Sequence, residues 1–192
     1  MSIAAINLAG NAPDLPEVNA EPEKETEEPE KIVFVKPHED GFCFVSTHSS
    51  GGRIYIDHAG ITDSPESGTE RISGYCRENG IKHVRYDCSV FIHEGKAIRE
   101  ALPDTYVTLY KPGQNLIDRI TAHLGFVKSK NFIFRKTKPE EYQKFVSLME
   151  QFNATLTYEY RNEARLPKEA YNIAMDILSD VAKYYRRNLL YR

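Results

Sequence analysis

The middle of the chain reads Ile81-Lys82-His83-Val84-Arg85-Tyr86-Asp87-Cys88-Ser89, and the other predicted elements are arranged around this segment. Its apolar side chains predict a short strand, although polar residues at 82 and 83 blur the alternation. A helix is predicted over 69–79, ending before Gly80, a residue type that commonly follows the last helical turn. A second helix is predicted from about His93. Asp87 therefore closes a strand that is flanked by helices on both sides.

Asp87 has two interpretations. In open sheets with crossover helices, ligands bind at the carboxyl ends of the strands. A carboxylate in that place can hold a divalent metal, because hard cations prefer oxygen ligands. Alternatively, Asp87 is a solvated side chain that caps the following segment. The order of the surrounding elements favours the ligand-binding interpretation.

Three strands are predicted before this segment, over 31–37, 42–47 and 53–58. The short turns between them are typical of antiparallel neighbours, so we expect a meander. A loop is predicted over 60–68. The later expectations are a helix over 94–102, a strand over 105–110, a helix over 114–124, an extended piece over 131–135, a helix opened by Pro139 and a last helix from Pro167 to about Leu190. The segment 154–165 fits either an extended or an irregular structure.

Composition indicates one folded domain with an acidic tail. The 192 residues, 41% of them hydrophobic, suffice for a single core. Residues 1–31 contain four prolines and eight acidic residues against two lysines, a net charge of −6. Such a segment buries too little apolar surface to offset the entropy of ordering. We therefore predict a disordered tail over 1–31 and a folded α/β domain over 32–192.

Several classes of partner and site are disfavoured. The three cysteines lack metal-binding spacing, which indicates reduced thiols and a cytoplasmic location. No apolar run approaches the roughly 20 residues that span a bilayer. The sequence also lacks a G-x-x-x-x-G-K-[ST] phosphate loop, so neither a membrane nor ATP is an expected partner. The histidines lack the spacing of a metal-binding helix and are interpreted as ordinary.

The order of three antiparallel strands followed by strand and helix units is the ribonuclease H-like order, a mixed sheet with helices on its faces. Nucleases of this fold bring together carboxylates from the first strand, the end of the fourth strand and the last helix. Those carboxylates hold two divalent metal ions that clamp the attacking and leaving oxygens of a phosphodiester.

Over roughly residues 32–178, the chain resembles the nuclease domain of the phage terminase large subunit. Residues 35–37 read V-K-P where the family reads V-D-P, and Asp87 matches the acid that ends the fourth strand. Residues 115–120 read N-L-I-D-R-I against N-K-x-x-R-I. Residues 172–177 read N-I-A-M-D-I against D-D-A-x-D-A, which keeps the final acid and loses the acid pair.

The resemblance implies Asp87 and Asp176 as catalytic carboxylates and ligands of Mg²⁺ or Mn²⁺, with Asp40 as a substitute from the turn after the first strand. Lys36 replaces the first metal ligand of the family. Its ammonium is expected to pair with Asp87 and to block the metal site. We therefore expect divalent-metal-dependent endonuclease activity to be weak or lost.

The resemblance also implies double-stranded DNA as the partner, in phage genome processing and packaging in the host cytoplasm, with Lys111, Asn115 and Arg119 as DNA contacts. An alternative is a non-catalytic protein-interaction module that uses the same scaffold, with the acidic tail docking to a phage or host protein. The cations at 183, 186 and 187 are expected to complement the dipole at a helix C-terminus.

Overall fold

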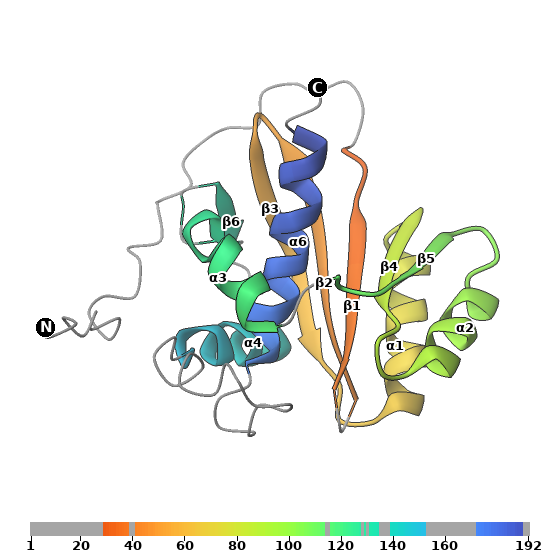
Figure 1. Cartoon of the computed structure of the whole chain (residues 1–192). Coiled ribbons are helices and arrows are strands. Elements are labelled where there is room, and N and C mark those ends of the chain that lie inside the picture. The colour runs from red at the N-terminus through yellow and green to blue at the C-terminus, as the bar shows by residue number, and fades with distance from the viewer. Residues whose placement is uncertain are drawn as a thin grey trace, which may run out of the picture.

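The computed structural model describes residues 29–38, 41–113, 116–127, 129, 131–134, 139–152 and 172–189. In this part of the chain the elements follow the order β1 (Ile32–His38), β2 (Gly41–Ser50), β3 (Arg53–Ile61), α1 (Pro65–Glu78), β4 (His83–Asp87), α2 (Ile92–Ala101), β5 (Tyr106–Tyr110), α3 (Leu116–Val127), β6 (Phe132–Phe134), α4 (Glu140–Glu150) and α6 (Ile173–Leu189) (Figure 1). Most of the predicted acidic tail lies outside the described residues. So do 154–165 and the start of the predicted last helix.

The strands form one six-stranded sheet in the order β5-β4-β1-β2-β3-β6. β1, β2 and β3 pair as neighbouring antiparallel strands, which confirms the predicted meander. β4 lies parallel to β1, and β5 lies parallel to β4. The other edge is formed by β6, which runs parallel to β3. The result is the predicted mixed sheet, with its first and fourth strands side by side.

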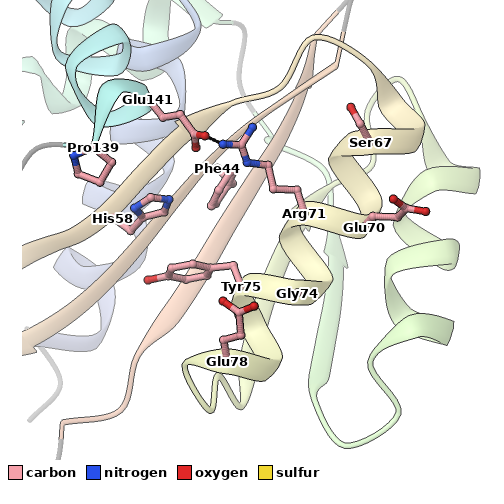
Figure 2. Close-up of a pocket in the computed structure, with 10 residues that line it drawn as sticks. All are labelled: Phe44, His58, Ser67, Glu70, Arg71, Gly74, Tyr75, Glu78, Pro139 and Glu141. Carbon is pink, nitrogen blue, oxygen red and sulfur yellow. Dashed lines mark ion pairs between the residues drawn. The ribbon is translucent and has the colours of Figure 1, made fainter.

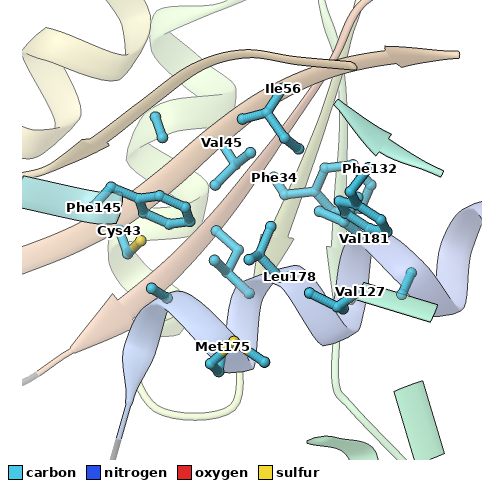
Figure 3. Close-up of a cluster of buried hydrophobic side chains, with 14 of the residues drawn as sticks. Phe34, Cys43, Val45, Ile56, Val127, Phe132, Phe145, Met175, Leu178 and Val181 are labelled. Carbon is cyan, nitrogen blue, oxygen red and sulfur yellow. The ribbon is translucent and has the colours of Figure 1, made fainter. Parts of the chain in front are cut away.

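Helices cover both faces of the sheet (Figure 1). The side chains of β1 alternate between these two faces. Val33 and Val35 are fully buried in a cluster that also contains Ile72 of α1 and Ile98 of α2. On the other face, Phe34 packs in a larger cluster with residues of α3, α4 and α6. Figure 3 shows this second cluster, in which side chains of α6 meet those of the sheet. Alternation places Lys36, two residues after Phe34, on the same face as α6.

The first helix begins earlier than the sequence predicted. Part of the predicted loop over 60–68 is helical, because α1 begins at Pro65. The Ser64 hydroxyl accepts a hydrogen bond from the Ser67 amide at 3.2 Å, and proline is well suited to the first helical position. The helix ends as expected: Gly80 follows the cap with φ +61°. Within the described residues, no helix combines the length and apolar character needed to cross a membrane.

Candidate functional site

The ammonium group of Lys36 lies among three carboxylates at the carboxyl ends of β1 and β4. Its Nζ is 2.9 Å from Asp87 Oδ2, 3.0 Å from Asp176 Oδ1 and 2.8 Å from Asp180 Oδ2. All four side chains are at most 6% exposed. We call these four residues the Lys36 cluster. The expected contact between Lys36 and Asp87 is therefore present, and α6 supplies two further partners.

Strand register and helix periodicity together bring these groups to one point. Val35 of β1 lies opposite Tyr86 of β4 in the parallel pair, so Lys36 and Asp87 are the next residues along each strand. Asp176 and Asp180 are four residues apart in α6, a spacing that places side chains on one helical face. Because α6 packs on the same sheet face, its two carboxylates reach the lysine.

Neighbouring groups hold each carboxylate in place. The Arg119 guanidinium donates to Asp176 at 2.5 Å, and its Nε lies 3.7 Å from Asp180. The Tyr110 hydroxyl donates to Asp180 at 2.8 Å. On the β4 side, both the amide and the hydroxyl of Ser89 donate to Asp87, at 2.9 and 2.5 Å. Counting Arg119, two cations face three carboxylates, which leaves a formal charge of −1.

The carboxylates keep Lys36 positively charged. Burial alone would lower the pKa of Lys36, but Asp176, Asp180 and Asp87 together outweigh it and raise that pKa well above the ordinary value. Burial also raises the pKa of Tyr110, and nearby Asp180 and Asp87 raise it further. Lys36 is therefore an ammonium ion and Tyr110 a neutral phenol at neutral pH, so neither side chain can act as a general base.

The other residues predicted from the sequence are placed differently. Arg119, expected to contact DNA, is 7% exposed and pairs with carboxylates of α6. Lys111 is exposed just beyond the end of β5. Asp40 and Asn115 lie outside the described residues. The sequence analysis missed Asp180, although its position one helical turn after Asp176 was a usable signal.

The residues of the cluster do not fit a pair of divalent ions. Lys36 Nζ already fills the space between the three carboxylates, at hydrogen-bond distance from each. Its charge neutralises much of the negative charge that would attract a metal. The Lys36 ammonium thus lies at the point between the carboxylates where a metal ion would have to bind.

A hollow of about 540 Å³ lies away from the Lys36 cluster, between α1, the sheet and the start of α4 (Figure 2). The His58 ring stacks on Tyr75 at 4.8 Å between centroids, and Arg71 forms an ion pair with Glu141 across the opening. Burial lowers the pKa of His58, and Arg71 lowers it further. None of the four residues of the Lys36 cluster lines this hollow.

No family model and no curated protein matches the chain. Several solved structures do match the chain. A lysine-to-alanine variant of the nuclease domain of the large terminase subunit gp2 of bacterial virus Sf6, with manganese, is 13% identical over 82% of this chain and 89% of that chain, with a TM-score of 0.53. The Mn-soaked, inhibitor-bound human cytomegalovirus terminase nuclease domain is 9% identical over 81% and 82%, with a TM-score of 0.53.

The large terminase from a thermophilic bacteriophage is also similar, at 12% identity and a TM-score of 0.51. That match covers 84% of this chain but 40% of the longer one. The chain therefore has the ribonuclease H-like fold of terminase large-subunit nuclease domains, as the sequence resemblance implied.

Proposed function

We propose that this chain is a terminase-nuclease-like protein that acts on or beside double-stranded DNA in phage genome processing, and that its metal-dependent cleavage is weak or lost. The observation that carries this proposal is the position of Lys36 Nζ within 3.0 Å of three buried carboxylates. The fold is that of terminase nuclease domains, whereas the cation held by the three carboxylates is the ammonium of Lys36.

The chemical argument is electrostatic. Two-metal hydrolysis needs carboxylates that are free to bind two divalent ions on either side of the phosphodiester. Here each carboxylate is already bound to Lys36, and Arg119 also pairs with the two carboxylates of α6. A metal ion would have to displace a permanently charged ammonium from a site with almost no solvent exposure. The cluster instead acts as an ionic joint between β1, β4 and α6.

The proposal predicts that purified protein does not cut duplex DNA with Mg²⁺ or Mn²⁺. The informative variant is Lys36→Asp, which removes the ammonium and adds an oxygen ligand beside Asp87. Titration calorimetry should show a gain in Mn²⁺ affinity for this variant. Lys96→Asp, on the exposed surface of α2, is the matched control and should show no gain. Cleavage itself is expected to stay weak, because Asn172 and Ile173 stand where the family has acids.

Efficient metal-dependent cleavage by the wild-type protein would contradict the proposal. If the wild-type protein cuts DNA with Mg²⁺ and Asp87→Ala abolishes the cutting, then Lys36 does not block the site. Asp40, Asp87 and Asp176 would then be the candidate catalytic carboxylates of an active nuclease. If the protein neither cuts nor binds DNA, the protein-interaction module becomes the better proposal, with the acidic tail as its docking arm.

A further inference from the structure

A positively charged hollow of about 360 Å³ adjoins the Lys36 cluster on the face of the sheet that α6 covers. It is lined mainly by Arg85, Tyr110, Lys111, Lys183, Tyr184 and Arg187. These residues come from β4, from the end of β5 and the loop after it, and from the second half of α6. Asp180 of the Lys36 cluster also borders the hollow, so the two sites share a wall.

Arg85 is held in place by two aromatic rings. Its guanidinium carbon lies 5.0 Å from the Tyr110 ring centre and 4.7 Å from that of Tyr184. Cation–π contacts of this kind restrain the position of the guanidinium. The N–H groups at its edges then remain suited to a planar or tetrahedral anion such as phosphate. Arg85 precedes Asp87 by two residues, so strand alternation points both side chains to this face.

The charge balance of the hollow favours an anionic ligand. Four cationic side chains line it, against the single carboxylate of Asp180. That carboxylate is already bound to Lys36 and Tyr110. Among the described residues, none of the four cations forms an ion pair within 4.0 Å with a carboxylate.

The helix dipole accounts for only part of this arrangement. Cations in the last turn of a helix complement its dipole without any ligand, which explains Arg187 but not Lys183, more than one turn earlier. Arg85 and Lys111 belong to the sheet and to the loop after β5, so the dipole of α6 gives no reason for their presence. Four cations from three elements converge here.

We infer that this hollow binds phosphate groups of a DNA strand, with Arg85 as the fixed anchor and the other three cations as additional backbone contacts. The inference rests on the proposed function and assigns the DNA contact to the surface beside the Lys36 cluster. Phosphate contacts from Lys and Arg supply most of the sequence-independent affinity of proteins for DNA. The hollow lies near the small end of the ligand-site range, about 300–1,000 Å³, which suits a single nucleotide unit.

The test compares two triple variants that remove the same charge. The pocket variant carries Lys111→Gln, Lys183→Gln and Arg187→Gln. The control carries Lys82→Gln, Lys96→Gln and Arg77→Gln, all at exposed positions and two of them on helices that cover the opposite face. Each variant is titrated against a fluorescent duplex, a single strand and a free nucleoside triphosphate over a range of salt concentrations.

We expect the pocket variant to bind DNA roughly tenfold or more weakly, and its salt-dependence slope to fall by about 1 for each lost phosphate contact. The control should remain within about twofold of the wild type in affinity, because exposed charges away from the hollow are largely screened by salt. Arg85→Lys keeps the charge but loses the stacked plane, so it should also weaken binding. Thermal unfolding of each variant confirms that the fold is retained.

Each outcome has a distinct meaning. If the wild type binds DNA and the two triple variants are weakened equally, this inference is wrong while the proposed function stands. If the wild type binds no DNA, the proposed function and this inference fail together. Binding of the free nucleotide alone overturns DNA as the ligand. Selective loss of DNA binding in the pocket variant supports the inference.

Discussion

Replacing Lys36 by methionine tests whether the ammonium stands in for a metal ion. Methionine is similarly unbranched, so the substitution removes the charge with little change of shape. The cluster, counted with Arg119, would pass from a formal charge of −1 to −2, with three carboxylates left in a site at most 6% exposed. Removing one partner of a buried ion pair typically costs about 3–5 kcal/mol of unfolding free energy.

The loss is large enough to measure in a chain of this size. At about 2–4 °C per kcal/mol, the melting temperature of Lys36→Met should fall by roughly 6–20 °C. The exposed Lys96→Met variant is the control, and it should stay within about 0.5 kcal/mol of the wild type. Thermal and urea unfolding give independent values of the change.

The decisive measurement adds Mn²⁺. Removal of the ammonium leaves carboxylates that a divalent ion can neutralise, so Mn²⁺ should restore stability to Lys36→Met. At a concentration of about 100 times its Kd, the gain is about 2.7 kcal/mol. The wild type should not respond. The reasoning is refuted if Mn²⁺ stabilises the wild type in a manner that Asp87→Ala abolishes, or if Lys36→Met is as stable as the wild type without metal.

Two further predictions concern protonation and thiol chemistry. The lowered pKa of His58 means that the folded state binds fewer protons than the unfolded state. The contribution of neutral His58 to the free energy of unfolding is therefore fully present above about pH 6.5, and it is lost as the pH falls through the lowered pKa. His58→Gln should flatten urea-derived stability between neutral and mildly acidic pH, and an unchanged slope would contradict this. Burial raises the pKa of Cys76 to about 12, and burial also raises that of Cys43. A thiol reagent at pH 8 should therefore modify both cysteines rapidly in denaturant and only slowly in the native protein, whereas rapid native modification would show that the core opens.

Much of the sheet could be predicted from the sequence, because its signals are local. Alternating apolar residues and short turns define β1, β2 and β3, and the alternation along β1 assigns Lys36 to one face. The order of strands and helices then predicts that β1 and β4 are neighbours. Those two facts are sufficient to expect a contact between Lys36 and Asp87.

Local signals also mislead at the edges of elements. Pro65 favours a loop in the sequence because proline often interrupts structure, yet it begins α1 after the Ser64 cap. The boundary depends on whether the preceding serine can accept the Ser67 amide, and that is a matter of three-dimensional geometry. A residue type alone does not decide it.

Only the tertiary structure determined which side chains complete the site. The rotation of α6 about its axis is fixed by the packing of its apolar side chains against the sheet, and this packing turns Asp180 toward Lys36. Contacts of this kind join residues more than 50 positions apart, as does the pairing of Arg119 with Asp176. The sequence by itself determined that a lysine stands near the carboxyl end of the first strand. The spacing of Asp176 and Asp180 places both on one face of a helix, but only the packing of α6 on the sheet turns that face toward the lysine.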